Sequence, residues 1–158
     1  MKQLSFVVLV IVIATMQLAA QQQFRKNTVF GEIGGNGMIL SLNFEHQTGT
    51  KPGLGWHAGI GLGGDNPAFP LGLTYLVNLG DSKSFLDAGA GINLLEKKML
   101  EGKNTNADKN PYKAAYVPSL GYRHQTHYGL MWRINYSPVF SKYRSWPAYF
   151  GVAAGWRI

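Results

Sequence analysis

Six charged residues lie at alternating positions inside segments that are otherwise apolar or rich in glycine. They are three acids and three arginines: Glu32, Glu45, Asp87, Arg123, Arg133 and Arg157. If these side chains share an interior, opposite charges must pair there, because an isolated buried charge costs several kcal/mol. We therefore expect an internal charge network of salt bridges, with Glu32 and Arg133 near mid-height. The alternative use of the same residues is a proton or ion path.

The histidines offer little further chemistry. His124 and His127 form an H-x-x-H pair in a predicted turn, unlike the helical H-E-x-x-H arrangement that holds zinc beside a catalytic base. We therefore predict no metal site and no cofactor. His57 near Glu45 or Asp87 could form a proton-transfer pair, although a hydrogen-bonded interior residue explains it equally well.

The segments that must position these residues alternate in polarity with a period of two. In 149–158, Phe150, Val152, Ala154, Trp156 and Ile158 are apolar, and the residues between them are small or polar. This alternation indicates a β-strand with two unlike faces. Turn residues separate eight such predicted strands: 28–35, 38–47, 54–63, 70–79, 84–95, 114–123, 128–138 and 147–157.

One face of these strands is apolar, whereas the other carries the six charges, several asparagines and many of the 20 glycines. In a soluble sandwich or a soluble ligand-binding barrel, the apolar face would form the interior. A polar interior and an apolar exterior are typical of an outer-membrane barrel. The pattern predicts an all-β fold, an eight-stranded antiparallel up-and-down transmembrane β-barrel. A soluble periplasmic ligand-binding barrel is the alternative class.

The connections between the strands fall into two groups. Short ones at 48–53, 80–83 and 124–127 are expected on the periplasmic side with both chain ends, and longer ones at 64–69, 96–113 and 139–146 outside. Pro118 falls inside the sixth strand, where we expect a bulge or a break, because proline cannot donate a ladder hydrogen bond. If 28–47 formed one kinked strand instead, the strand count would be odd.

Turn residues also predict the register of neighbouring strands. A two-residue turn at Asn36-Gly37 and another at Asp81-Ser82 would each align apolar with apolar residues. The predicted pairs are Ile33 with Leu40, Val77 with Leu86, Phe44 with Trp56, and Tyr122 with Tyr128.

Two groups of residues are expected to meet the membrane. Aromatic side chains that point outward near strand ends would form interfacial girdles: Phe44, Trp56, Phe85, Tyr122, Tyr128, Tyr136, Trp146 and Trp156. Lysines of the longest predicted loop would contact lipopolysaccharide, unless that loop is merely mobile and solvated: Lys97, Lys98, Lys103, Lys109 and Lys113.

The N-terminus of the 158-residue chain has the features of an export signal. Lys2 precedes an apolar run from Phe6 to Ala14, which is too short for a membrane-spanning helix of about 20 residues. We expect a signal peptide at 1–20 and one barrel domain at 21–158; an uncleaved anchor is the alternative. Removal of Lys2 leaves 14 basic against 8 acidic residues, a net charge of +6 that favours anionic lipid. The charge is scattered, so nucleic acid is not an expected partner.

Four stretches of the chain resemble the small outer-membrane β-barrel proteins common in Bacteroidota. They are Glu32-Ile33-Gly34-Gly35-Asn36-Gly37, Ser41-Leu42-Asn43-Phe44-Glu45, Pro70-Leu71-Gly72-Leu73-Thr74-Tyr75-Leu76 and Tyr116-Val117-Pro118-Ser119-Leu120-Gly121-Tyr122-Arg123. The resemblance implies an outer-membrane location in a Gram-negative envelope and insertion by the outer-membrane assembly machinery. Its motifs are structural, and they transfer no catalytic residue.

These observations favour a non-enzymatic integral outer-membrane protein with a structural or surface-contact role and a lumen plugged by salt bridges. The alternative is a lipid A-modifying or lipid-hydrolysing enzyme on a small barrel. Such an enzyme would need a serine, a histidine and an acid at one rim. Ser119 and Ser137 have no such partners suggested nearby, so we predict no catalytic residue.

Overall fold

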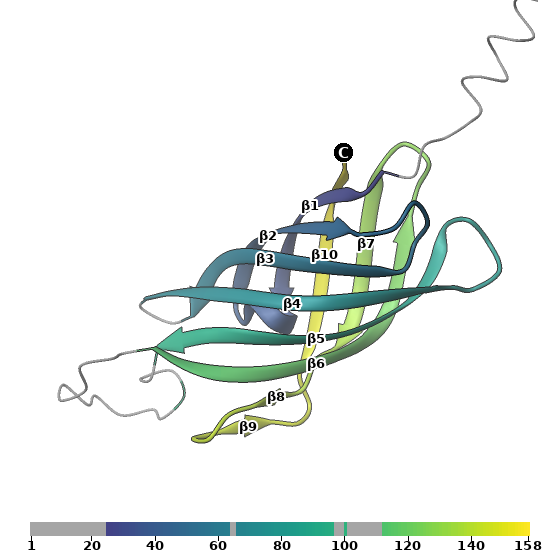
Figure 1. The fold of residues 1–158 in the computed structure, drawn as a ribbon. Helices are drawn as coiled ribbons and strands as arrows, with labels where there is room; N and C mark the ends of the chain where they lie inside the picture. Colours follow the sequence, from purple (N-terminus) through teal and green to yellow (C-terminus); the bar gives the residue numbers. More distant parts are fainter. Residues whose placement is uncertain (1–24, 64–65, 97–99, 101–111) are drawn as a thin grey trace, which may run out of the picture.

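Eight long antiparallel strands close into a barrel in the computed structural model, which describes residues 25–63, 66–96, 100 and 112–158. The strands are β1 (Asn27–Gly34), β2 (Leu40–Gln47), β3 (Leu54–Gly63), β4 (Asn66–Asn78), β5 (Ser84–Glu96), β6 (Tyr112–Gln125), β7 (Leu130–Tyr136) and β10 (Phe150–Arg157). Each pairs with its neighbour in the chain, β7 pairs with β10, and the β1–β10 pair closes the ring (Figure 1). The predicted eight-stranded antiparallel barrel is therefore confirmed, and 28–47 forms two strands.

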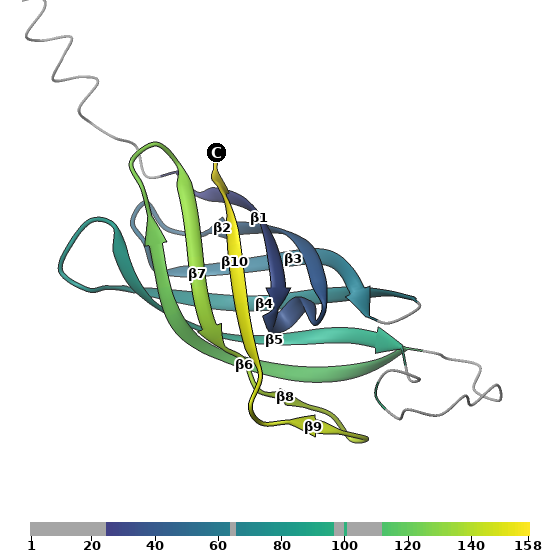
Figure 2. The same ribbon diagram turned by 180° about the vertical axis from the view of Figure 1, so that it is seen from behind.

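The two ends of the barrel differ. One end, called here the terminal end, holds residue 25, Ile158 and the turns at 48–53, 79–83 and 126–129. The other, called the hairpin end, holds the 3-10 turn η1 (Gly35–Gly37) and the short strands β8 (Val139–Phe140) and β9 (Ser145–Trp146). Both views of the ribbon show this separation (Figures 1 and 2). The predicted signal peptide at 1–20 lies outside the described residues.

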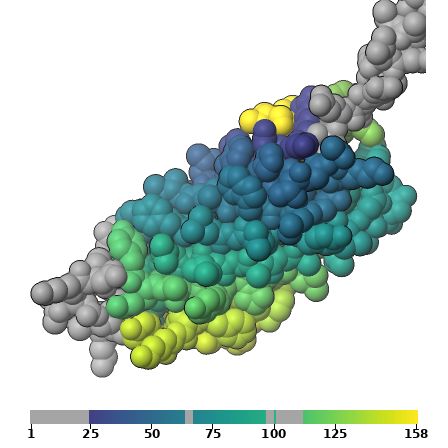
Figure 3. Space-filling view, in the orientation of Figure 1, coloured from purple at the N-terminus to yellow at the C-terminus, as the bar shows by residue number. Residues whose placement is uncertain are grey.

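The two faces of the strands have the predicted orientation. Side chains such as Leu42 and Ile134 point outward and are 58% and 51% exposed, whereas Asn43 and Arg133 on the same strands are buried. Since successive side chains of a strand point to opposite faces, the same alternation runs around the whole ring. Consecutive strands form a continuous outer surface (Figure 3). Apolar residues therefore cover the exterior, and most polar strand residues face inward.

The β4–β5 register follows the prediction because Asp81 closes the turn. Its carboxylate accepts hydrogen bonds from the backbone N–H groups of Lys83 (2.9 Å) and Ser84, and from the Ser84 hydroxyl (2.9 Å). These bonds, led by that from Lys83, hold the pKa of the Asp81 carboxyl below its usual value. Val77 pairs with Leu86 as expected.

Two other predicted registers are wrong. Phe44 pairs with Ala58, and His46 takes the place expected for Phe44 opposite Trp56. On β6, Tyr122 pairs with Ile134, because β6 continues to Gln125 and the chain turns only at 126–129. In both cases the observed register is shifted from the predicted one by an even number of residues. Such a shift leaves every side chain on the same face, so the polarity pattern cannot detect it.

The connection between β1 and β2 also differs from the prediction. Ile33 pairs with Leu40 as expected, but the chain does not make a two-residue turn at Asn36-Gly37. Gly34 and Gly35 have φ values of 75° and 59°, and Met38 has a φ of 65°. These conformations, which favour glycine, direct η1 into the barrel, where Asn36 and Met38 are buried.

β6 has no break at Pro118, contrary to the prediction; the interruption lies in the pairing between β6 and its neighbours β7 and β8. Pro118 pairs in register with Ala90 of β5, and β6 is continuous there. On its other side, Leu120 pairs with Tyr136 of β7 and Tyr116 pairs with Phe140 of β8 in one shared register. That register sets Pro118 opposite Pro138, and the ladder is interrupted where neither residue has an N–H. Beyond this interruption, the segment predicted as the connection 139–146 forms the β8–β9 hairpin.

One predicted outward aromatic residue is wrong. Phe85 is only 1% exposed and shares the inward parity of Asp87, two residues later on β5. The outward residue is its neighbour Leu86, which pairs with Val77. In the described ranges, no helix has the length and apolar character needed to cross a membrane.

Candidate functional site in the barrel interior

Five of the six predicted charged residues meet inside the barrel. Glu32 lies on β1, Glu45 on β2, Asp87 on β5, Arg123 on β6 and Arg133 on β7, and all five are buried. Their inward parity on strands that close into a ring brings together residues as far apart as Glu32 and Arg133, which are 101 positions apart. We call these five residues the lumen charge network.

Arg133 contacts all three acids of this network. Its Nη2 donates to Glu32 Oε1 at 2.9 Å, and its Nη1 lies 3.6 Å from Asp87 Oδ2 and 3.9 Å from Glu45 Oε2. The guanidinium also lies over the Phe30 ring, 4.6 Å from the ring centroid, which is a cation–π distance. Arg133 on β7 therefore links β1, β2 and β5.

Arg123 forms the second centre of the network. Its Nη1 donates to both Glu45 carboxylate oxygens, at 2.7 and 2.9 Å, and lies 3.6 Å from Asp87 Oδ2. Gln47 donates a further hydrogen bond to Glu45 Oε1 at 3.0 Å. Pairing and hydrogen bonding offset part of the cost of removing these charges from water. The Nε atoms of Arg123 and Arg133 are buried without a hydrogen-bond partner in the described part of the chain.

Arg157 lies apart from this cluster, at the terminal end. Its Nη2 donates to the backbone carbonyl of Arg25 at 3.1 Å, and the Arg25 Nη1 donates to the Arg157 carbonyl at 2.9 Å. Arg157 is half-buried. These reciprocal bonds join the start of the described barrel to its last strand.

The inward turn η1 occupies the hairpin end of the interior. Asn36 Nδ2 lies 3.1 Å from His57 Nε2 and donates to the Leu71 carbonyl at 3.2 Å, and the Asn36 carbonyl accepts a bond from Asn93. The Tyr149 hydroxyl donates to the Met38 carbonyl at 2.7 Å. Four segments of the barrel wall therefore hold the turn in place.

The turn also joins the charge network. The backbone N–H of Gly37 donates to Glu32 Oε2 at 3.3 Å, on the carboxylate that pairs with Arg133. Inward glycines make room for it: a Cβ at Gly91 would lie 2.5 Å from Asn36 Nδ2. Sequence reasoning missed the role of Asn36. A glycine-rich turn facing inward glycines on other strands was the signal that could have revealed it.

The histidines occupy separate positions. His57 is buried beside Asn36, whereas the His46 ring lies 2.7 Å from Asn27 Oδ1 near the terminal end. His124 stacks on Trp132 with ring centroids 5.7 Å apart, and His127 lies in the exposed turn at 126–129. No group of three His, Cys, Asp or Glu side chains in the described ranges is placed to hold a metal ion.

The two inward serines have structural surroundings. Ser137 accepts a hydrogen bond from Asn135 Nδ2 at 2.7 Å and is buried. A Cβ at Gly89 would lie 2.7 Å from the Ser119 hydroxyl, so Ser119 packs against the neighbouring strand. For the residues that the structure describes, no hydrogen bond joins either serine to a histidine.

The predicted membrane-contacting residues are placed as follows. Outward and exposed aromatics are Phe44, Trp56, Tyr122, Tyr128, Tyr136 and Trp156, whereas Trp146 is half-buried against an internal apolar cluster around Val139. Lys113 lies on β6 opposite Leu95. The other four lysines, Lys97, Lys98, Lys103 and Lys109, lie outside the described residues.

No protein-family model, curated protein or solved structure matches this chain. The barrel and its two unlike faces are therefore the features that bear on its function.

Proposed function

We propose that this chain is an integral outer-membrane β-barrel protein with a non-enzymatic structural or surface-contact role in the cell envelope. The observation that carries the proposal is the inverted polarity of the barrel. Apolar side chains cover its outside on every long strand, and five charged side chains form ion pairs inside it. A closed barrel pairs all of its backbone hydrogen bonds internally, so only its side chains need to suit hydrocarbon.

The extent of the apolar surface supports this proposal. Soluble monomers rarely expose a contiguous apolar patch larger than a few hundred Å². Here Ile33, Leu42, Leu73, Ile134 and Val152 are each about half exposed or more, on strands all around the ring. Hydrocarbon chains would cover this surface at no cost in solvation.

The side chains that fill the interior support the proposal that the lumen is closed to ions. An eight-stranded barrel is just wide enough for its own side chains to fill. In this protein the lumen charge network crosses the interior of the barrel, and η1 enters the interior from the hairpin end. We propose that these two features plug the lumen, so the surface of the barrel and not a channel carries the function.

An orientation follows from the proposal. With a cleaved export signal, the terminal end would face the periplasm and the hairpin end would face the outside. The assembly machinery of the outer membrane would insert the barrel. Exposed Trp156 and Tyr128 lie toward the terminal end, where a periplasmic aromatic girdle is expected.

Membrane fractionation combined with gel mobility before and after boiling tests the proposal. We expect the protein in the outer-membrane fraction and a folded band that shifts only on heating. Planar-bilayer recordings of the purified protein should show no steady conductance. Recovery in the soluble periplasmic fraction would overturn the membrane location, and a stable conductance would overturn the plug.

A further inference from the structure

A shallow apolar groove crosses the outer face of strands β3 to β6. Its volume is about 750 Å³, and its floor is formed by small residues, including Ala58, Gly72 and Ala90. Its walls include Trp56, Leu73, Ile92 and Tyr116. A second apolar groove lies over β1 to β4 on the same outer face, and its lining includes Leu42, Ile60 and Leu62. Of the two, the groove on β3 to β6 is the one that reaches β6.

A row of paired residues connects this groove to the β8–β9 hairpin. Ala58 pairs with Leu71, Leu71 with Ile92 and Ile92 with Tyr116, and Tyr116 pairs with Phe140 of β8. Four strand spacings separate the two ends of the row, a span of roughly 19 Å. The hairpin lies directly against β6 in the space-filling view (Figure 3). The groove therefore leads to the base of the hairpin.

The tip of the hairpin carries two cations in a fixed turn. Ser141 Oγ accepts hydrogen bonds from the backbone N–H groups of Tyr143 (3.2 Å) and Arg144 (3.0 Å), and its hydroxyl donates to the Arg144 carbonyl (2.7 Å). The Arg144 guanidinium lies 5.1 Å from the Trp146 ring centroid. Lys142, which follows Ser141 in the turn, is exposed.

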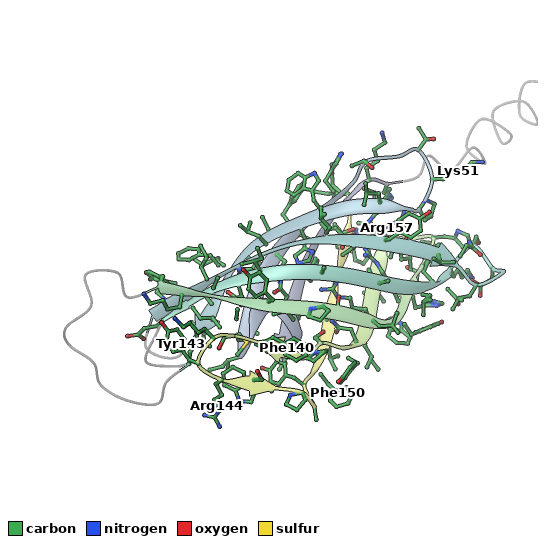
Figure 4. The ribbon with its side chains drawn as sticks, turned by 60° about the horizontal axis from the view of Figure 1, so that its bottom comes forward. Lys51, Phe140, Tyr143, Arg144, Phe150 and Arg157 are labelled. Atoms are coloured by element: carbon green, nitrogen blue, oxygen red, sulfur yellow. The ribbon has the colours of Figure 1, made fainter. Side chains whose placement is uncertain are left out.

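The final part of the chain, which includes the hairpin, carries charge of one sign. The sequence from 112 to 158 contains no aspartate and no glutamate. No carboxylate in the described part of the chain pairs with Lys142 or Arg144. Figure 4 shows Tyr143 and Arg144 at the tip of the hairpin, at the opposite end of the barrel from Lys51. The tip therefore presents positive charge beside exposed aromatic rings.

The geometry points to a binding site for a phosphorylated, acylated lipid of the outer leaflet, the lipid A part of lipopolysaccharide. Lys142 and Arg144 bind its phosphate, and the groove on β3 to β6 receives an acyl chain. This inference rests on the proposed outer-membrane location. It adds a defined lipid to that location, recognised at both its charged and its apolar part.

Native mass spectrometry of the purified, folded protein in detergent micelles, titrated with diphosphoryl lipid A, tests the cationic half of the site. The double variant K142A/R144A should bind about 30-fold more weakly than the unmodified protein. The matched control K51A/K83A removes the same charge at the terminal end and should stay within about twofold. Equal losses in both double variants would show unspecific charge attraction and would overturn the site.

A second pair of variants tests the groove. Ala90→Leu fills its floor and should weaken lipid A binding roughly tenfold. Ala154→Leu makes the same outward change on β10, away from the groove, and should leave binding unchanged. If Ala90→Leu binds as tightly as Ala154→Leu, the groove does not hold an acyl chain.

The outcomes separate this inference from the proposed function. Each variant should keep the heat-dependent gel shift, which shows that the barrel is folded. A barrel that fractionates with the outer membrane, but whose variants all bind lipid A as the unmodified protein does, would overturn the lipid site alone. A soluble protein without the gel shift would overturn the membrane proposal itself.

Discussion

Arg133 depends on partners that are distant in the sequence. Its guanidinium contacts Glu32, Glu45 and Asp87, which come from three different strands. Each of these carboxylates is almost completely removed from water. Loss of the cation would leave them near one another with only Arg123 as a buried counter-charge. Breaking such a buried pair is costly even where the intact pair contributes little net stability.

Arg133→Ala should lower the free energy of unfolding by about 3–5 kcal/mol. Urea-induced unfolding in lipid vesicles, followed by tryptophan fluorescence, measures the change. The control is Arg144→Ala on the exposed hairpin, which should change stability by less than about 0.5 kcal/mol. Equal urea midpoints for the unmodified protein and Arg133→Ala would show that the network does not stabilise the barrel.

At the scale of the element, η1 is the least regular segment and one of the best anchored. Met38 adopts a φ of 65°, which a residue with a side chain seldom takes. Contacts to Asn36 and the hydrogen bond from Tyr149 hold the turn in the interior. Space for the turn depends on Gly91, because any side chain there would overlap Asn36.

Gly91→Val should push η1 out of its internal position. Because the chain has no cysteine, Met38→Cys gives a single labelling site that is buried when the turn is in place. In the Gly91→Val background, labelling by a polar maleimide should be about tenfold faster, a population change of about 1.4 kcal/mol. Gly53→Val is the control, since the nearest atom to its Cβ would be 3.9 Å away. The same labelling rate in both backgrounds would contradict the proposed role of Gly91.

At the scale of the whole molecule, the outer face determines which solvent suits the barrel. Leucine, isoleucine and aromatic side chains on all sides would favour aggregation in water, whereas they match the hydrocarbon of a bilayer. The middle of the outer surface should therefore tolerate charge least. Positions near the strand ends, which would lie close to lipid head groups in the proposed membrane location, should tolerate it better.

Ile134→Arg places a charge at the middle of β7 on the outside of the barrel. In vesicles, this change should cost about 2–4 kcal/mol of unfolding free energy. Leu130→Arg, at the strand end, should cost about 0–1 kcal/mol. Urea unfolding of both variants measures the difference. Two equally stable variants would indicate that water and not lipid surrounds the barrel.

Much of the architecture was predictable because side-chain direction in a strand depends only on odd or even position. This rule is sufficient for the two faces and for the inward direction of Glu45 and Arg123, whereas turn residues between the alternating segments indicate the strand count. The same rule gives Leu86 an outward and Phe85 an inward direction, as the structure has them. The outward prediction for Phe85 relied on its aromatic ring near a strand end and ignored its odd or even position. The registers of β2–β3 and β6–β7 were not predictable, since a slip by an even number of residues preserves every face.

Local sequence, through the alternation of apolar and polar residues, was enough to determine an eight-stranded barrel with its charges on the inner side. Closure of the ring decided the rest: the pairing of Arg133 with three acids, the place of Arg157 at the terminal end, the inward path of η1 and the alignment of Pro118 with Pro138. Each of these depends on residues tens of positions apart. Their proximity results from strand register around a closed sheet, which no local pattern encodes.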